Sequence, residues 1–201
     1  MKSLNNRKGI TLPELLIYAF LFGIILTGIY GIFISSMKYY RVTEARTIMH
    51  QNAMNSMANL FSETPGAKST SVVIGSAPSG LYFLSARKSD GSYEFDSTGK
   101  IKWQRWVCYY LKQETNGKYS LMRKEAPLSL PTANPGACPY STVTAFANST
   151  VSADTIATGI QSMTIAKQAT GNYSFEIIFD QTTDTTKPNR LQVATRIQTR
   201  N

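Results

Sequence analysis

The pattern of apolar and polar positions changes twice along the chain. A run without formal charge extends from Leu15 to Ile34, and nearly all of its residues are apolar or small. At about 1.5 Å per residue, such a helix spans roughly 30 Å, the thickness of the hydrocarbon core of a bilayer. We therefore expect a single transmembrane helix at about residues 15–34.

The next segment, about residues 35–62, keeps good helix formers but has apolar residues on one side only. Its apolar stripe consists of Ala45, Met49, Ala53, Met57 and Leu60, and the opposite side carries Arg46, Gln51, Asn55 and Asn59. This spacing predicts an amphipathic helix that continues the membrane helix without a break and ends near "TPG". The stripe needs a cover, and the domain that follows is the nearest candidate.

After residue 67 the period becomes two, which is typical of strands that bury one face. Five segments rich in aromatic and β-branched residues show this pattern, at 80–86, 100–113, 118–124, 172–180 and 190–198. Strands with one wet face and one buried face favour an antiparallel sheet. The predicted fold class is α+β, with a long N-terminal helix at 10–64 packed on a largely antiparallel β-sheet domain at 65–201.

Two of the predicted strands show the alternation in detail. In one, Ile101, Trp103, Val107, Tyr109 and Leu111 are expected on one face, with Arg105 as a charged exception among them. In the last strand, Leu191, Val193, Thr195 and Ile197 are expected opposite Gln192, Arg196 and Gln198. Between two strands, Asn116-Gly117 is a hairpin signal because both residue types tolerate positive φ.

Flanking charge predicts the orientation of the membrane helix. Lys2, Arg7 and Lys8 precede the span without an acidic residue among them, which favours a cytoplasmic N-terminus and an extracytoplasmic β-rich domain. Lys38 and Arg41 follow the span closely, which weakens this asymmetry without reversing it.

The formal net charge of +9 is compatible with a nucleic-acid or anionic-lipid partner. The basic residues are scattered, so a solvated surface is the simpler interpretation. A nucleic-acid site stays open because basic grooves with aromatic residues can hold single strands. The basic residues in question are Arg87, Lys88, Lys100, Lys102, Arg105, Arg123 and Lys124, with Trp103 and Trp106 nearby.

The two cysteines, Cys108 and Cys138, favour a disulfide in an exported domain, and two buried free thiols are the alternative. Together with the single histidine, His50, they are too few for the four ligands of a usual zinc site.

No catalytic motif is apparent in the sequence, so we expect no enzyme, no metal and no cofactor. His50 falls in the predicted amphipathic helix, where a surface or interface role is expected. Asp90, Glu94 and Asp96 invite a calcium interpretation but lack the spacing of an EF-hand loop, and an acidic hairpin is the simpler hypothesis.

Glu14 lies at the start of the apolar run, where an unpaired charge is costly. Cleavage after Gly9 would make Ile10 the N-terminus, with its amine about one helical turn from Glu14. A neighbouring chain shifted by roughly one turn would bring its own amine to this carboxylate, and the pair attracts strongly in a low dielectric. Pro13 is tolerated here because a first-turn amide has no helical partner.

The segment "RKGITLPELLIYAF" resembles the class III signal of type IV prepilins and of type II secretion pseudopilins. The resemblance implies a leader peptide at 1–9, cleavage between Gly9 and Ile10 by a prepilin peptidase, and N-methylation of Ile10. It also implies that Glu14 is the assembly carboxylate. Phe most often follows the cleavage site in these families, whereas this chain has Ile10.

The segment "IKWQRWVCYYLKQETNGKYSLMRKEAPL" is similar to the central region of J-type minor pseudopilins and W-type minor pilins. The resemblance implies a pilin-like minor subunit of the bacterial inner membrane that primes or forms the tip of a type II secretion pseudopilus or type IV pilus. The implied partners are other minor and major subunits, the inner-membrane assembly platform and membrane lipid. A tip-exposed subunit that binds DNA or a surface, and an uncleaved membrane-anchored receptor or enzyme, are the alternatives.

Overall fold

The computed structural model describes residues 10–169, 171–181 and 189–199. The chain divides into two units, residues 1–44 and 45–201, which we describe separately. The expected leader peptide, Gly9 included, lies outside the described residues.

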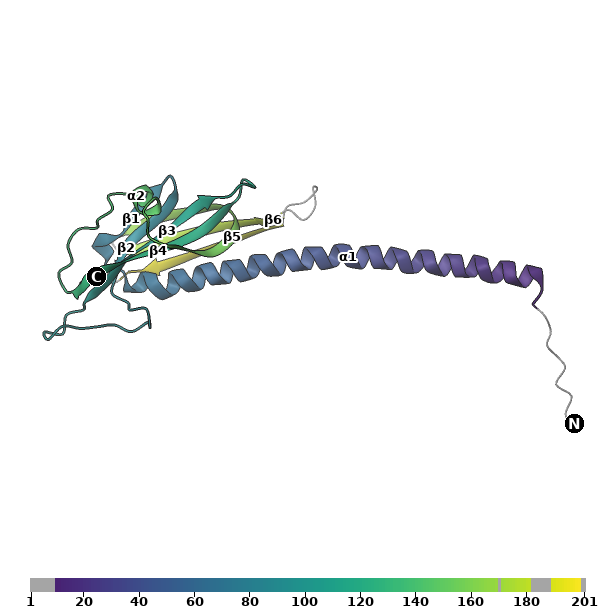
Figure 1. Ribbon diagram of the computed structural model, residues 1–201, viewed down its shortest axis with the longest axis horizontal. Helices are drawn as coiled ribbons and strands as arrows, with labels where there is room; N and C mark the ends of the chain where they lie inside the picture. Colours follow the sequence, from purple (N-terminus) through teal and green to yellow (C-terminus); the bar gives the residue numbers. More distant parts are fainter. Residues whose placement is uncertain (1–9, 170, 182–188, 200–201) are drawn as a thin grey trace, which may run out of the picture. The chain divides into compact units, whose positions relative to one another are not determined.

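Helix α1, Leu12–Glu63, has no break along its length (Figure 1). The predicted helix ending near Ser62 is therefore confirmed to within one residue. Every side chain from Leu12 to Arg41 is exposed, and the buried positions of the helix begin at Ala45. The predicted apolar stripe is confirmed, because Ala45, Met49, Ala53, Met57 and Leu60 are all buried.

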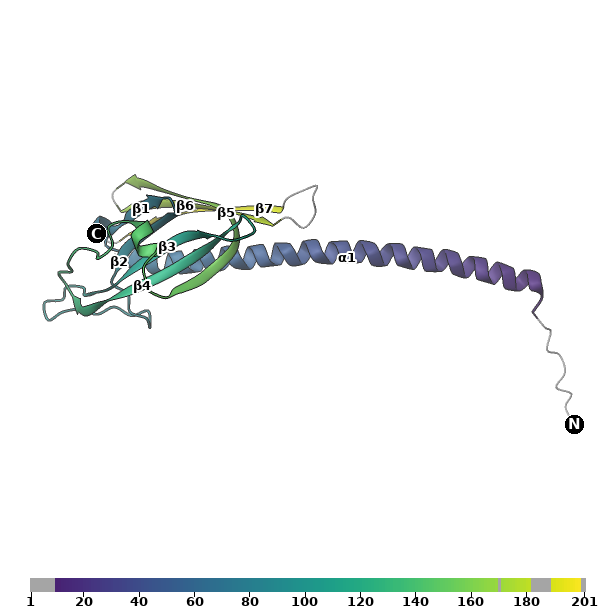
Figure 2. The same ribbon diagram turned by 45° about the horizontal axis from the view of Figure 1, so that its top comes forward.

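Among the described residues, seven strands form one antiparallel sheet in which each strand pairs with its neighbour in sequence (Figures 1 and 2). They are β1 (Val73–Ser76), β2 (Ser79–Ser85), β3 (Trp103–Gln113), β4 (Tyr119–Thr132), β5 (Ala153–Ala169), β6 (Asn172–Gln181) and β7 (Asn189–Gln198). The five predicted segments correspond to β2, β3, β4, β6 and β7. Strands β1 and β5 were not predicted. The second unit also contains the short helices η1 (Thr64–Gly66), η2 (Ser69–Ser71) and α2 (Val143–Ala147).

The main core of the second unit lies between α1 and the sheet. Met49, Ala53, Met57 and Leu60 from the helix share one apolar cluster with residues from β2 to β7. In β7, Ile197 belongs to this cluster and Val193 packs against it, whereas Gln192 and other residues of the opposite face are exposed, as the alternation predicted. The α+β prediction, a long helix on an antiparallel sheet, is confirmed.

A second core covers the other face of the central strands. In β3, Trp106, Cys108 and Tyr110 belong to a cluster that also contains Val143 and Phe146 of α2. Strand β3 is therefore buried on both faces from Arg105 to Leu111. The prediction of one wet face is wrong for β3, because α2 and the segment before it cover the face that the alternation left to solvent.

The predicted face of β3 also needs a correction at its start. Val107, Tyr109 and Leu111 belong to the core beneath α1, whereas Trp103 belongs to the second core. The pairing of β3 with β4 shifts register between Trp103 and Arg105. Trp103 thus lies beyond an irregularity in the pairing, and it packs on the other side of the sheet from Val107.

The predicted hairpin between β3 and β4 is present, with a different turn from the one its sequence suggested. Gly117 has a φ of 77°, and no non-glycine residue that the structure describes has a positive φ. The Gly117 amide donates to the Glu114 carbonyl at 3.1 Å, and the Glu114 amide donates to the Lys118 carbonyl at 2.8 Å. This pattern is a turn closed by a glycine bulge, so only one of the two positions uses positive φ.

Candidate functional site

The first turn of α1 contains the acidic residue that the sequence singled out. Thr11 directly precedes the helix, and both its amide and its hydroxyl donate to Glu14 Oε2 at 2.9 Å. The Leu15 amide donates to the Thr11 carbonyl at 3.1 Å and closes the turn. A carboxylate at the third helical position that accepts from the capping residue is half of a capping box, which satisfies an otherwise unpaired amide.

Glu14 therefore has a partner within its own chain. Both contacts use the same carboxylate oxygen, Oε2, and the side chain is exposed. A second subunit that offers its N-terminal amine would add to this contact or displace it. The sequence reasoning missed the role of Thr11, although the spacing Thr-x-x-Glu before an apolar run was the signal for it.

The part of α1 that follows Glu14 has the properties of a membrane span. By length and composition, α1 is the one helix among the described residues that is long and apolar enough to cross a membrane. Its apolar side chains from Leu15 to Ile34 are all exposed. Their exposure is compatible with a lipid environment, because lipid would cover side chains that no other residue of the first unit covers.

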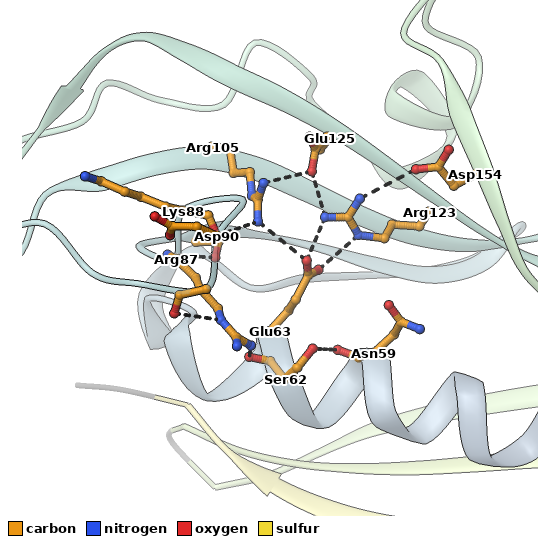
Figure 3. Close-up of polar contacts among 12 residues, drawn as sticks. Asn59, Ser62, Glu63, Arg87, Lys88, Asp90, Arg105, Arg123, Glu125 and Asp154 are labelled. Atoms are coloured by element: carbon orange, nitrogen blue, oxygen red, sulfur yellow. Dashed lines mark hydrogen bonds and ion pairs between the residues drawn. The ribbon is translucent and has the colours of Figure 1, made fainter.

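The other end of α1 lies in a cluster of charged residues (Figure 3). Glu63, the last residue of the helix, accepts from Arg123 Nη2 at 2.6 Å and from Arg123 Nε at 3.2 Å. The Tyr109 hydroxyl also donates to Glu63, at 2.7 Å. Arg105 lies 3.7 Å from the same carboxylate, and Glu125 bridges the two arginines at 3.1 and 2.7 Å.

Charge and burial both act on this cluster. Burial lowers the pKa of Arg123, but the hydrogen bond and the charge of Glu63 outweigh it, so the pKa of the guanidinium is raised. Burial, and then the charge of Glu63, raise the pKa of Tyr109, so its hydroxyl stays a donor. A carboxylate at a helix C-terminus opposes the helix dipole, and the two arginines compensate for that cost. The cluster joins the end of α1 to β3 and β4.

A third arginine caps the same helix end. Arg87 donates from Nη1 to the carbonyl of Ser62 and from Nε to the carbonyl of Gly91 at 3.1 Å. The last carbonyls of a helix lack intrahelical donors, and a cationic side chain is a favourable partner for them. Arg87 thus links the end of α1 to the hairpin at residues 88–102.

The three acidic residues of that hairpin are used inside it. Asp90 accepts from the amide and hydroxyl of Ser92, and Asp96 accepts from those of Thr98. These hydrogen bonds lower the pKa of both carboxyl groups. Glu94 pairs with Lys102 at 2.8 Å and with Lys88 at 3.2 Å, and these contacts lower its pKa to about 2. The acidic hairpin fits the structure, and no group of metal-ligating residues occurs in the part of the chain that it describes.

The basic residues considered for nucleic-acid binding do not form an open groove with the tryptophans. Trp103 and Trp106 are 7% and 5% exposed and belong to the second core. Arg105 and Arg123 pair with Glu63, and Lys88 and Lys102 with Glu94. Lys124 is 5% exposed and donates to the carbonyls of Ala147 and Ser149 at 2.6 and 2.8 Å. Of the seven, Lys100 is the one that is exposed, and its charge helps to lower the pKa of Asp96.

Both cysteines lie at the second core as free thiols, so the disulfide that the sequence favoured is not formed in this structure. Cys108 is fully buried within the cluster, and the partly buried Cys138 packs against it. Burial raises the pKa of Cys108 to about 12 and also raises that of Cys138. Because both cysteines lie at the same cluster, a disulfide between them in the exported protein stays a prediction. His50 is exposed on α1.

Comparison with known proteins bears on the N-terminal segment. Residues 4–30 match the family model of the prokaryotic N-terminal methylation motif. The match supports a type IV pilin-like protein. The matched segment contains the expected cleavage site, the Thr11–Glu14 pair and most of the predicted span. Searches of curated proteins and of solved structures gave no match to the chain.

Proposed function

We propose that this pilin-like chain is a minor pseudopilin or minor pilin that helps prime or form the tip of a type II secretion pseudopilus or type IV pilus. In this role a prepilin peptidase cleaves the chain between Gly9 and Ile10, and Ile10 is then N-methylated. The chain acts as a structural subunit with no catalytic role and no cofactor.

The observation that carries this proposal is the place of Glu14 in the matched motif. The carboxylate lies one turn from Ile10, at the start of a helix of membrane length. The amine that cleavage would create on a second chain is the natural partner for a carboxylate at this depth, because an unpaired charge near lipid is costly. Its internal bond to Thr11 keeps Glu14 satisfied until that partner arrives.

The second unit offers a further argument for contacts between subunits. On the side of α1 that the sheet leaves uncovered, Met54 is 71% exposed and Phe61 is 48% exposed. They lie seven positions apart, and hence on one face of the helix. Exposed apolar residues on a regular helix face fit packing against a neighbouring subunit better than they fit water.

The proposed location is the bacterial inner membrane, with the N-terminus in the cytoplasm and residues 65–201 on the extracytoplasmic side. The basic leader residues support this orientation through the positive-inside rule. The expected partners are the prepilin peptidase, the other minor and major subunits and the inner-membrane assembly platform. The J-type or W-type assignment rests on the similarity of residues 101–128 to those subunits.

DNA binding at the tip is a weaker second candidate. The basic residues that suggested it are mostly paired with acidic residues, and both tryptophans are buried. We therefore expect the full-length chain in detergent to show no salt-dependent binding of single-stranded DNA. Binding at low salt that is lost at high salt would restore this candidate.

The experiment that tests the main proposal is the intact mass of the chain after co-expression with a prepilin peptidase. We expect the mass of a chain that begins at Ile10 and carries one added methyl group. The matched control is Gly9→Leu, which should retain the leader under the same conditions. A wild-type mass with the leader retained would contradict the proposal.

A further inference from the structure

Four consecutive residues follow the apolar run of α1 and have no role in the proposed assembly contact. They are Lys38, Tyr39, Tyr40 and Arg41, which we call the juxtamembrane ring. All four are exposed on the regular helix of the first unit, and the two tyrosines are 77% and 66% exposed. These are large side chains that nothing in this unit covers.

The four residues surround the helix instead of forming a stripe. Successive positions of an α-helix are rotated by about 100°, so four consecutive residues point to nearly all sides. A folded protein that packs against the helix would contact one side of it. A partner that surrounds a single helix in one plane is the headgroup layer of a membrane.

The depth of the ring agrees with that layer, because helical side chains lean toward the N-terminus and so reach back toward the hydrocarbon core. The apolar run ends at Ile34, and the ring begins about 6 Å and ends about 10 Å farther along the helix. The headgroup region extends roughly 5–8 Å beyond the hydrocarbon core on each side. Tyrosine is enriched in the headgroup layer of membranes. Lys and Arg can bury their apolar stems near the hydrocarbon core while their charged ends stay in this layer.

The charge of the ring also calls for an external partner. No acidic residue lies between Glu14 and Glu44 in the sequence, and neither Lys38 nor Arg41 forms an ion pair with a residue that the structure describes. On the proposed extracytoplasmic side, these two charges oppose the positive-inside rule. Phosphate groups of anionic lipids in that leaflet would offset the opposition.

We propose that the juxtamembrane ring binds the headgroups of anionic phospholipids in the leaflet that faces the globular domain. Lys38 and Arg41 contact the phosphates, and Tyr39 and Tyr40 lie in the same headgroup layer. The contact sets the depth of α1 in the membrane before the subunit enters a fibre. The proposal rests on α1 as a membrane span and on the orientation proposed above, but it does not depend on leader cleavage.

The test uses the full-length chain in nanodiscs of phosphatidylcholine with a minor fraction of photoreactive phosphatidylglycerol. Crosslinking yield to the labelled lipid is compared for the wild type and for Lys38→Gln/Arg41→Gln. We expect the double variant to lose about fivefold or more of the yield, since each basic residue near an anionic surface contributes about a fivefold preference. The wild-type yield should also fall at high salt.

The matched control is Lys112→Gln/Lys167→Gln, which removes the same charge from exposed positions of β3 and β5. Its yield should equal that of the wild type, and circular dichroism should show the same helix content in all variants. Equal yields for the ring variant and the wild type would overturn the proposal. A wild-type sample that contains an acidic protein bound at the ring and shows no crosslinking to the labelled lipid would also overturn it.

Leader cleavage is measured separately, by the intact mass of the chain after co-expression with a prepilin peptidase. If the wild type is cleaved but its lipid contact does not depend on the ring, this inference is wrong and the proposed function is retained. An uncleaved wild type whose lipid contact depends on the ring would do the reverse. The two proposals therefore fail separately.

Discussion

Glu63 and Arg123 form a bidentate ion pair that joins the last residue of α1 to strand β4 (Figure 3). Their side chains are 10% and 12% exposed, so the pair is largely withdrawn from water. A buried carboxylate between two arginines is stable only while all partners remain, since an uncompensated buried charge costs several kcal/mol. The helix end and the sheet are thus joined through charge as well as through the apolar core.

The first prediction concerns the removal of this charge. Glu63→Gln keeps the shape of the side chain but leaves Arg105 and Arg123 with one carboxylate fewer. We expect the free energy of unfolding of the second unit to fall by about 3 kcal/mol, the usual cost of breaking a buried pair from one side. Urea unfolding of the full-length chain in detergent, followed by near-UV circular dichroism, measures this change.

The matched control is Glu114→Gln, which removes the same charge from an exposed turn. Surface charges of this kind contribute little, so its stability should remain within about 0.5 kcal/mol of the wild type. Equal unfolding midpoints for Glu63→Gln and Glu114→Gln would show that the cluster adds nothing to the packing of α1.

Arg105 illustrates what the sequence could and could not predict about this cluster. Its position as a charged exception on an apolar face of β3 was visible in the alternation. The reason was not visible, because Glu63 approaches that face only after the helix has packed on the sheet. A long-range ion pair between a helix end and two strands leaves no periodic signal in a single sequence.

Strand β5 shows the same limit for the fold. Strands β6 and β7 alternate large apolar and polar residues and were predicted, whereas Ala153–Ala169 consists mainly of Ala, Thr, Ser and Gln. These residues give a weak hydrophobic pattern. Gly159 within the strand has a φ of 73°, and the pairing of β5 with β4 shifts register twice. The long helix was predictable because its first half is apolar on all sides and its second half keeps one apolar stripe.

A second prediction concerns the start of α1. Glu14→Ala should leave leader cleavage intact but abolish incorporation into fibres, since the neighbouring N-terminal amine would lose its partner. Thr11→Val removes one of the two donors to Glu14 and keeps the amide, so we expect a smaller loss. Immunoblots of sheared fibres from cells that express the complete assembly system provide the measurement.

Thr27→Ala is the control for this series, because its hydroxyl donates only to the Gly23 carbonyl within the helix. It should assemble like the wild type. Normal fibre incorporation of Glu14→Ala would remove the basis for the assembly carboxylate and favour a simple membrane anchor.

A third prediction concerns the cysteines. In the reduced protein, iodoacetamide should modify Cys138 well before Cys108, because Cys108 is fully buried and its pKa is raised to about 12. Only the thiolate reacts, so both burial and the raised pKa slow the reaction. Peptide mass mapping over time distinguishes the two sites. In the reduced protein, faster modification of Cys108 than of Cys138 would contradict their placement at the second core. The same assay without reductant tests the pairing, since a disulfide would protect both residues.

The last prediction concerns acid and the hairpin at residues 88–102. Lys102 and Lys88 lower the pKa of Glu94 from 4.5 to about 2 in the folded protein. A lowered pKa means that the stabilising effect is present above pH 4.5 and is lost as the pH falls toward about 2. Asp90 and Asp96 also have lowered pKa values and contribute in the same direction. We expect the protection factors of the hairpin amides, which are corrected for the intrinsic pH dependence of exchange, to fall over this range while those of β3 stay high.

Glu94→Gln separates the contribution of the ion pairs from that of the two aspartates. Its hairpin should exchange faster than that of the wild type at pH 6, and the difference between them should shrink as the pH falls and Glu94 of the wild type becomes neutral. Glu114→Gln again removes one exposed charge without touching these contacts, and its hairpin should follow the wild type throughout. If the hairpin of Glu94→Gln exchanges at the wild-type rate at pH 6, the ion pairs with Lys88 and Lys102 do not stabilise it. The turns formed by Asp90 and Asp96 would then account for its protection.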